Sequence, residues 1–127
     1  MPIRIISGDK RGLRLHLPKD PSFRPTQAKV REAVFSMLQG KERDARVLDL
    51  YAGSGSMGFE AISRGASFCL FCEDSDEALE VLSKNVALFP KRRKDLETMR
   101  LNLPQELRQI SFREPFDLIF MDPPYKL

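Results

Sequence analysis

A short apolar run that ends in a glycine-rich turn constrains the fold of this chain more than any other feature. The run covers residues 47–51, and the turn after it reads Gly53-x-Gly55-x-x-Gly58. A buried strand that leads through such a turn into a helix is typical of parallel α/β sheets, because glycine lets the backbone turn sharply and approach a ligand closely. Apolar runs and helical patterns continue to alternate downstream, which favours the same fold class.

The remaining elements can be placed from periodicity and turn residues. We expect a hairpin at 3–17, a proline-rich linker at 18–25, strands at 47–51, 67–73, 97–103 and 116–122, and helices at 56–63, 76–89 and 104–109. A helix capped by Thr26 and ended by Gly40 should bury the apolar stripe of Val30, Ala33, Val34, Met37 and Leu38. The prediction is a Rossmann-like, doubly wound sheet, with an N-terminal extension (1–40) and a core (41–127).

Charge is unevenly distributed along the 127 residues. The formal net charge is +3, but residues 1–46 carry +6 and residues 47–127 carry −3. A basic N-terminal third favours a polyanionic partner over a neutral one. No apolar run reaches the roughly 18 residues of a membrane span, so a cytoplasmic protein without membrane contact is expected.

The cysteines and the single histidine argue against metal chemistry. Cys69 and Cys72 form a C-x-x-C, but they lie within a predicted strand, where residues three apart point to opposite faces. We interpret them as buried core thiols and expect no metal site. His16 is the only histidine, which also argues against a histidine-based catalytic triad.

Acidic residues end three of the predicted strands, at Asp49, Glu73 and Asp122. Ligands of open α/β sheets bind at the carboxyl ends of the strands, so these side chains should converge on one edge. Glu73 has the position expected of a carboxylate that binds ribose hydroxyls, and Asp49 suits a cationic group such as an amino acid amine. The pattern favours S-adenosylmethionine (SAM) over NAD.

The sequence Asp122-Pro123-Pro124-Tyr125 indicates the acceptor of the methyl group. The Asp122 carboxylate and the Pro123 carbonyl can each accept one N–H of an amine attached to a planar base, and the prolines offer no competing N–H. Tyr125 can stack on the base. Such contacts favour a nitrogen lone pair that points out of the ring plane, toward a methyl donor.

The chain resembles the RsmD family of bacterial small-subunit rRNA guanine-N2 methyltransferases. The resemblance rests on four segments: residues 4–12, residues 24–35, the glycine loop and the Asp122–Tyr125 motif. It implies a SAM cofactor, a guanine amine in 16S rRNA or in the small-subunit particle as substrate, catalysis by Asp122 to Tyr125, and RNA contacts or bracing of the pocket by Arg11, Arg24, Thr26 and Arg31. It also implies that SAM is bound by Asp49, Tyr51, Gly53, Gly55, Gly58, Glu73, Asp74 and Asn102.

Alternatives remain open at this level. The chain ends five residues after Asp122, whereas family members continue, so a C-terminally incomplete core with little activity of its own is expected. A non-catalytic RNA-binding remnant is one alternative, and a DNA or protein amino-methyltransferase is another, since the same tetrapeptide serves adenine and glutamine amines. The target nucleotide, the oligomeric state and the choice between naked RNA and assembled particle are not specified by the sequence.

Overall fold

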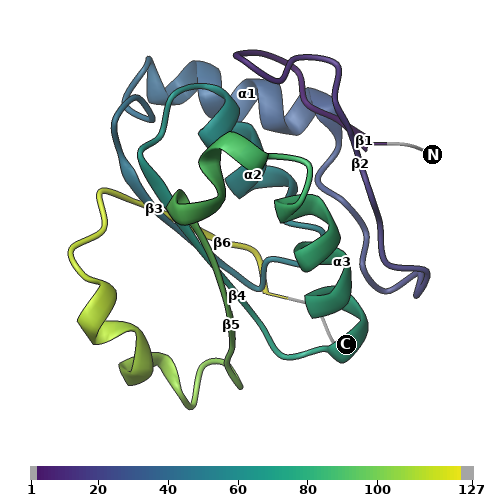
Figure 1. Ribbon diagram of the computed structural model, residues 1–127, viewed down its shortest axis with the longest axis vertical. Coiled ribbons are helices and arrows are strands. Elements are labelled where there is room, and N and C mark those ends of the chain that lie inside the picture. Colours follow the sequence, from purple (N-terminus) through teal and green to yellow (C-terminus); the bar gives the residue numbers. More distant parts are fainter. Residues whose placement is uncertain (1–2, 124–127) are drawn as a thin grey trace.

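Four parallel strands form the central sheet of the computed structural model, which describes residues 3–123 (Figure 1). Their order across the sheet is β5-β4-β3-β6, and each neighbouring pair is parallel. The strands are β3 Arg46–Leu50, β4 Phe68–Glu73, β5 Leu96–Arg100 and β6 Leu118–Met121. The predicted Rossmann-like class is confirmed, and within the described residues β5 and β6 are the edge strands.

Helices cover the two faces of this sheet unequally. They are α1 Ala28–Leu38, α2 Ser56–Ser63 and α3 Asp76–Val86, with the 3-10 helices η1 Pro90–Asp95 and η2 Leu107–Arg113. Phe35 of α1, Phe59 of α2 and Leu82 of α3 belong to one buried cluster, which we call the helix-side cluster. Ile110 of η2 belongs to a second, the η2-side cluster, on the other face.

The N-terminal residues form a small hairpin that packs on the same core. Strands β1 Ile3–Arg4 and β2 Arg14–Leu15 pair in antiparallel fashion, as predicted. Ile3, Ile5 and Leu15 are buried in the helix-side cluster. The extension is therefore attached to the sheet domain through shared apolar contacts.

The prediction for α1 is wrong about which face is buried. Val30 and Met37, on the predicted apolar stripe, are 49% and 80% exposed, whereas Arg31 and Phe35 are buried. Phe35 packs against Phe120 of β6 with ring centroids 5.7 Å apart. The positions of the apolar residues alone predict the wrong face, because Arg31 occupies a core-facing position. Its charge is balanced there by the buried Glu60.

Several element boundaries also differ from those predicted. The N-cap of α1 is Gln27, without a side-chain cap, rather than the predicted Thr26, whose carbonyl accepts from Arg31. Helix α3 ends at Val86 rather than at 89, and Pro90 begins a 3-10 helix. Strand β5 spans 96–100 rather than 97–103, and η2 spans 107–113 rather than 104–109, where Ile110 is buried against the sheet.

The two cysteines lie on opposite faces of β4, as predicted. Cys69 belongs to the helix-side cluster and Cys72 to the η2-side cluster, and both are buried free thiols. Within residues 3–123, no cluster of three or more His, Cys, Asp or Glu side chains is arranged as a metal site. The helices of these residues are all too short or too polar to cross a membrane.

Candidate cofactor and amine-binding edge

The turn from β3 into α2 is built from residues with unusual backbone angles. Tyr51, Gly53 and Gly55 have φ values of 57°, 57° and 82°, in the left-handed region that glycine adopts readily. The Ala52 N–H donates to the carbonyl of Cys72 at 3.0 Å, and the Gly55 N–H to that of Ala52 at 2.8 Å. The turn is thus fixed at the carboxyl end of the strands, as predicted.

Two glycines let α2 approach the sheet closely. A Cβ at Gly58 would collide with the Phe71 ring and lie 2.7 Å from Cys69 Sγ. A Cβ at Gly55 would lie 2.6 Å from the Phe59 ring and 2.7 Å from Leu82. Gly58 therefore shapes the candidate site by its packing and its N–H, while its Cα faces the sheet.

Glu73 joins the glycine turn to the end of β4. One carboxylate oxygen accepts from the Gly53 N–H at 3.0 Å, and the other accepts from the N–H groups of Asp74 and Ser75 at 2.9 and 3.1 Å. A carboxylate has about four lone-pair sites, so Glu73 retains capacity for ligand hydroxyls. The orientation of the Glu73 carboxylate is therefore set by the backbone of the glycine turn and of the loop that follows β4.

Asp49 is a buried acid of β3 whose carboxylate contacts the first turn of α2. It is 4% exposed and accepts from the Gly58 N–H at 3.1 Å. Burial raises the pKa of Asp49 to about 8, the Gly58 hydrogen bond opposes this, and the charges of Glu73 and Asp122 raise it further. A cationic ligand group at this edge would stabilise the ionised form of Asp49.

Asp122 lies at the end of the neighbouring strand. β6 pairs with β3 so that Phe120 is level with Asp49, and Asp122 follows two residues later with its side chain exposed. Asp122 therefore follows β6 at the same carboxyl end of the sheet as Asp49, and its negative charge contributes to the raised pKa of Asp49. Pro123 follows the strand and is exposed. Pro124 and Tyr125, which are also predicted to contact the base or its amine, lie outside the described residues.

The other predicted cofactor residues lie around the same edge with different environments. Tyr51 packs against the η2-side cluster, so its ring is turned toward the core. Asp74 is exposed, and its carbonyl accepts from Arg100 at 2.7 Å. Asn102 is exposed just after β5, where its N–H donates to Glu106 at 2.7 Å.

The structure separates the predicted RNA residues into two groups. Arg11, in the hairpin turn, and Arg24, in the linker, are exposed. Arg31 is only 1% exposed and donates to Glu60 at 2.9 Å, to the Arg4 carbonyl at 3.0 Å and to the Thr26 carbonyl at 3.2 Å. Arg31 therefore cannot reach RNA directly, and with Thr26 it braces the N-terminal extension.

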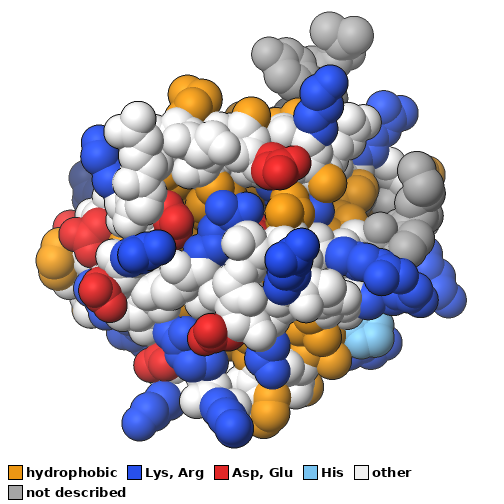
Figure 2. Space-filling model, turned by 90° about the horizontal axis from the view of Figure 1, so that it is seen from above, with side chains coloured by type: hydrophobic (Ala, Val, Ile, Leu, Met, Phe, Trp, Pro, Cys, Tyr) orange, Lys and Arg blue, Asp and Glu red, His pale blue; other side chains and the backbone are white. Residues whose placement is uncertain are grey.

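Lys and Arg side chains are prominent on the face formed by the hairpin, α1 and the loop before β3 (Figure 2). Arg4 and Arg14 are exposed partners in the β1–β2 ladder. Among residues 3–123 neither arginine forms a salt bridge. Like charges placed opposite each other on adjacent strands repel, which favours an anionic partner at this hairpin.

Two residues of this region were missed by the sequence analysis. Glu60, from α2, is fully buried and accepts from the Ile6 and Ser7 N–H groups as well as from Arg31. Phe23, in the linker, lies 3.8 Å from where a side chain at Gly53 would begin. Phe23 could have been recognised in the sequence, because it is the one aromatic residue of a polar, proline-rich linker. Nothing in the sequence around Glu60 predicts its burial.

Comparison with known proteins places the chain in a family. A family model described as conserved hypothetical protein 95, the RsmD family, matches residues 3–127. The chain belongs to the RsmD family. It is 38% identical to Bacillus subtilis YlbH over 98% of this chain and 67% of that protein. It is 36% identical to Escherichia coli K12 ribosomal RNA small subunit methyltransferase D over 98% of this chain and 61% of that protein.

A solved structure agrees with this assignment. A hypothetical protein from Thermus thermophilus superimposes with a TM-score of 0.79 at 33% identity, over 97% of this chain and 70% of that one. Residues 3–123 thus have the fold of this RsmD-family region. The chain spans about two thirds or less of the length of the curated relatives named above.

Proposed function

We propose that this chain carries the cofactor- and amine-binding edge of a SAM-dependent rRNA methyltransferase that modifies the N2 amine of a guanine. One observation carries the proposal: Asp49, Glu73 and Asp122 lie at the carboxyl ends of three adjacent strands, next to a glycine turn that permits close backbone approach. The names of the family relatives support rRNA as the substrate class. An rRNA substrate favours a cytoplasmic location.

The residues present fit a nucleoside cofactor with a cationic end. Glu73, held by three backbone N–H groups, would accept from ribose hydroxyls, and Asp49 would balance a positive charge. Asn102 would contact the base from the end of β5. When bound, SAM supplies an electrophilic methyl group on a sulfonium.

Asp122 and the Pro123 carbonyl would hold the acceptor. By accepting both N–H bonds they orient the amine and favour a lone pair outside the ring plane, which is a positioning effect. The negative charge of Asp122 also stabilises the positive charge that develops on the nitrogen. We expect Tyr125 to stack on the base.

The proposal is tested by transfer of labelled methyl from SAM to small-subunit rRNA, offered naked and as assembled particles. We expect the label in N2-methylguanine after digestion to nucleosides. Label in adenine would reject the N2-guanine reaction, and label in added DNA or protein but not rRNA would favour another amino-methyltransferase. Absence of transfer together with absence of SAM binding would reject the proposal as a whole.

Binding of SAM should release protons because of Asp49. Its pKa is raised to about 8, so at pH 7 the free protein holds this carboxyl mostly protonated, and a bound cation lowers the pKa. We expect release of up to about one proton at pH 7, with affinity rising toward pH 8 and levelling off above it. Calorimetry in buffers of different ionisation enthalpy measures this release.

Asp49→Asn is the matched variant for this measurement. It keeps an oxygen that can accept from the Gly58 N–H but has no titrating group. Proton release near pH 7 should disappear in this variant, while Asp20→Asn, at an exposed acid, should release as many protons as the wild type. Equal release by wild type and Asp49→Asn would contradict the role of Asp49.

A further inference from the structure

The most basic segment of the chain lies away from the candidate site. Helix η1 contains Lys91, Arg92, Arg93 and Lys94 in succession, with one acid, Asp95. It immediately precedes β5, so it lies at the amino end of the parallel strands. The candidate cofactor site is at their carboxyl ends, and the proposed methyl transfer does not use η1.

One of the four basic residues is used to hold η1 in place. Arg92 donates to Asp95 at 2.8 Å and to the Ala66 carbonyl at 2.6 Å. A third contact reaches the Ile62 carbonyl at 3.5 Å. Arg92 thus fixes η1 to the end of α2 and the loop before β4, which leaves its neighbours facing outward.

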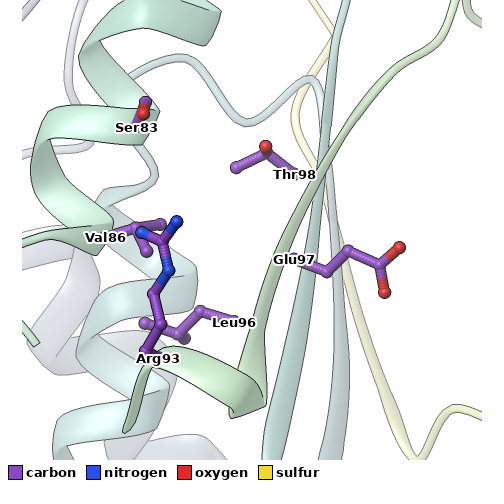
Figure 3. A pocket seen from close by; sticks show the side chains of 6 residues that line it. All are labelled: Ser83, Val86, Arg93, Leu96, Glu97 and Thr98. Carbon is purple, nitrogen blue, oxygen red and sulfur yellow. The ribbon is translucent and has the colours of Figure 1, made fainter. Parts of the chain in front are cut away.

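Arg93 lines a hollow of about 190 Å³ between α3 and β5 (Figure 3). The hydroxyl groups of Ser83 from α3 and Thr98 from β5 line the same hollow. In Figure 3 the Arg93 side chain extends between the two elements, alongside the apolar side chains of Val86 and Leu96 that line the same hollow. One guanidinium and two hydroxyls are a donor set that suits a phosphate group.

The nearby acid does not neutralise this hollow. The Glu97 carboxylate points away from it (Figure 3) and accepts twice from Arg113 on the other face, at 2.7 Å each. Lys91, Arg93 and Lys94 are exposed. Within residues 3–123 none of these three forms a salt bridge, so their mutual repulsion is uncompensated by the protein.

We propose that Arg93, Ser83 and Thr98 bind a phosphate of the RNA backbone, with Lys91 and Lys94 contacting neighbouring phosphates. This second RNA contact rests on the proposed function and lies at the opposite edge of the sheet from the methyl-transfer site. The row of cations along η1 favours a polyanion over a free phosphate ion, because one ion would engage only the hollow. The contact adds affinity independent of base sequence.

The test is the salt dependence of binding of the full chain to a labelled 16S rRNA transcript. Each phosphate contact contributes about 0.7–0.9 to the slope of log affinity against log salt. Lys91→Ala/Arg93→Ala/Lys94→Ala should therefore lower the slope by about two to three, and Arg93→Ala alone by about one. SAM affinity should be unchanged in both variants. Arg108→Ala, an exposed arginine of η2, is the control and should leave the slope unchanged.

The outcomes separate this inference from the proposed function. Failure of the wild type to bind rRNA overturns both. Binding by the wild type with the same slope in the triple variant overturns only the η1 contact. Titration of inorganic phosphate into the free protein at constant ionic strength identifies the source of the phosphate group: saturable binding that Arg93→Ala abolishes, together with an RNA salt slope that Arg93→Ala leaves unchanged, makes the hollow a small-anion site and rejects the RNA contact.

Discussion

Replacing Glu60 by alanine should reduce the free energy of unfolding by about 3–5 kcal/mol, the usual cost of removing one partner of a buried ion pair. Glu60 is fully buried and accepts from Arg31 and from Arg64 at 2.9 Å each. Its oxygens also accept from the backbone of Ile6 at 2.9 Å and Ser7 at 3.1 Å. Without it, the nearly inaccessible Arg31 guanidinium loses its anionic partner, and the two backbone N–H groups lose their acceptor.

This loss is large for a small domain, whose total stability is about 5–15 kcal/mol. Urea unfolding monitored by circular dichroism measures the loss of unfolding free energy.

Glu60→Gln keeps one acceptor oxygen, so it should reduce the free energy of unfolding less than Glu60→Ala does. It also provides the measurement if Glu60→Ala does not fold. Glu80→Ala removes an exposed acid whose ion pair with Lys84 spans 3.9 Å, so it should change stability by less than about 0.5 kcal/mol. A Glu60→Ala protein within about 1 kcal/mol of wild type, on the scale of ordinary substitutions, would contradict this account.

Asp122→Ala should lower kcat for methyl transfer to rRNA by about 100- to 1000-fold, a loss typical for removal of one transition-state hydrogen-bonding group. The carboxylate orients the amine and balances charge on nitrogen only as the methyl group is transferred, so kcat should fall more than affinity for RNA. SAM affinity should change little, because the cofactor contacts are assigned to Asp49 and Glu73. Single-turnover transfer of labelled methyl provides the rate.

The control for this experiment is Glu32→Gln, which neutralises an exposed acid of α1. It should transfer methyl at the wild-type rate. Asp122→Asn separates charge from hydrogen bonding, since the amide keeps one acceptor oxygen but loses the negative charge. Rates within threefold of wild type for both Asp122 variants would remove this residue from the mechanism.

The sheet and its turns could be predicted from sequence because their signals are local. The apolar run before Gly53 and the alternation of strand and helix specify a parallel sheet, and the acids at strand ends then fall on one edge. The structure places Asp49, Glu73 and Asp122 there. Local patterns also assigned Cys69 and Cys72 to opposite faces of β4.

The errors arose where a distant residue determines the environment. Arg31 was interpreted as an RNA-facing or bracing residue, and only the buried Glu60, 29 positions away, decides between the two. The same pairing shifts the buried face of α1 toward Arg31 and Phe35, so that Val30 and Met37 are exposed. In η1, four similar basic residues differ in role because Arg92 alone reaches Asp95 and the Ala66 carbonyl.

The roles proposed for Asp49, Glu73 and Asp122 all require that the carboxyl edge beside the glycine turn binds SAM. Titration calorimetry with the full chain measures this directly, using wild type, Glu73→Ala and the control Glu77→Ala. We expect saturable binding by the wild type and the control, and at least about tenfold weaker binding by Glu73→Ala, which loses a hydrogen-bonded charge. Equal SAM affinity in all three proteins would contradict the assignment of the cofactor site to this edge.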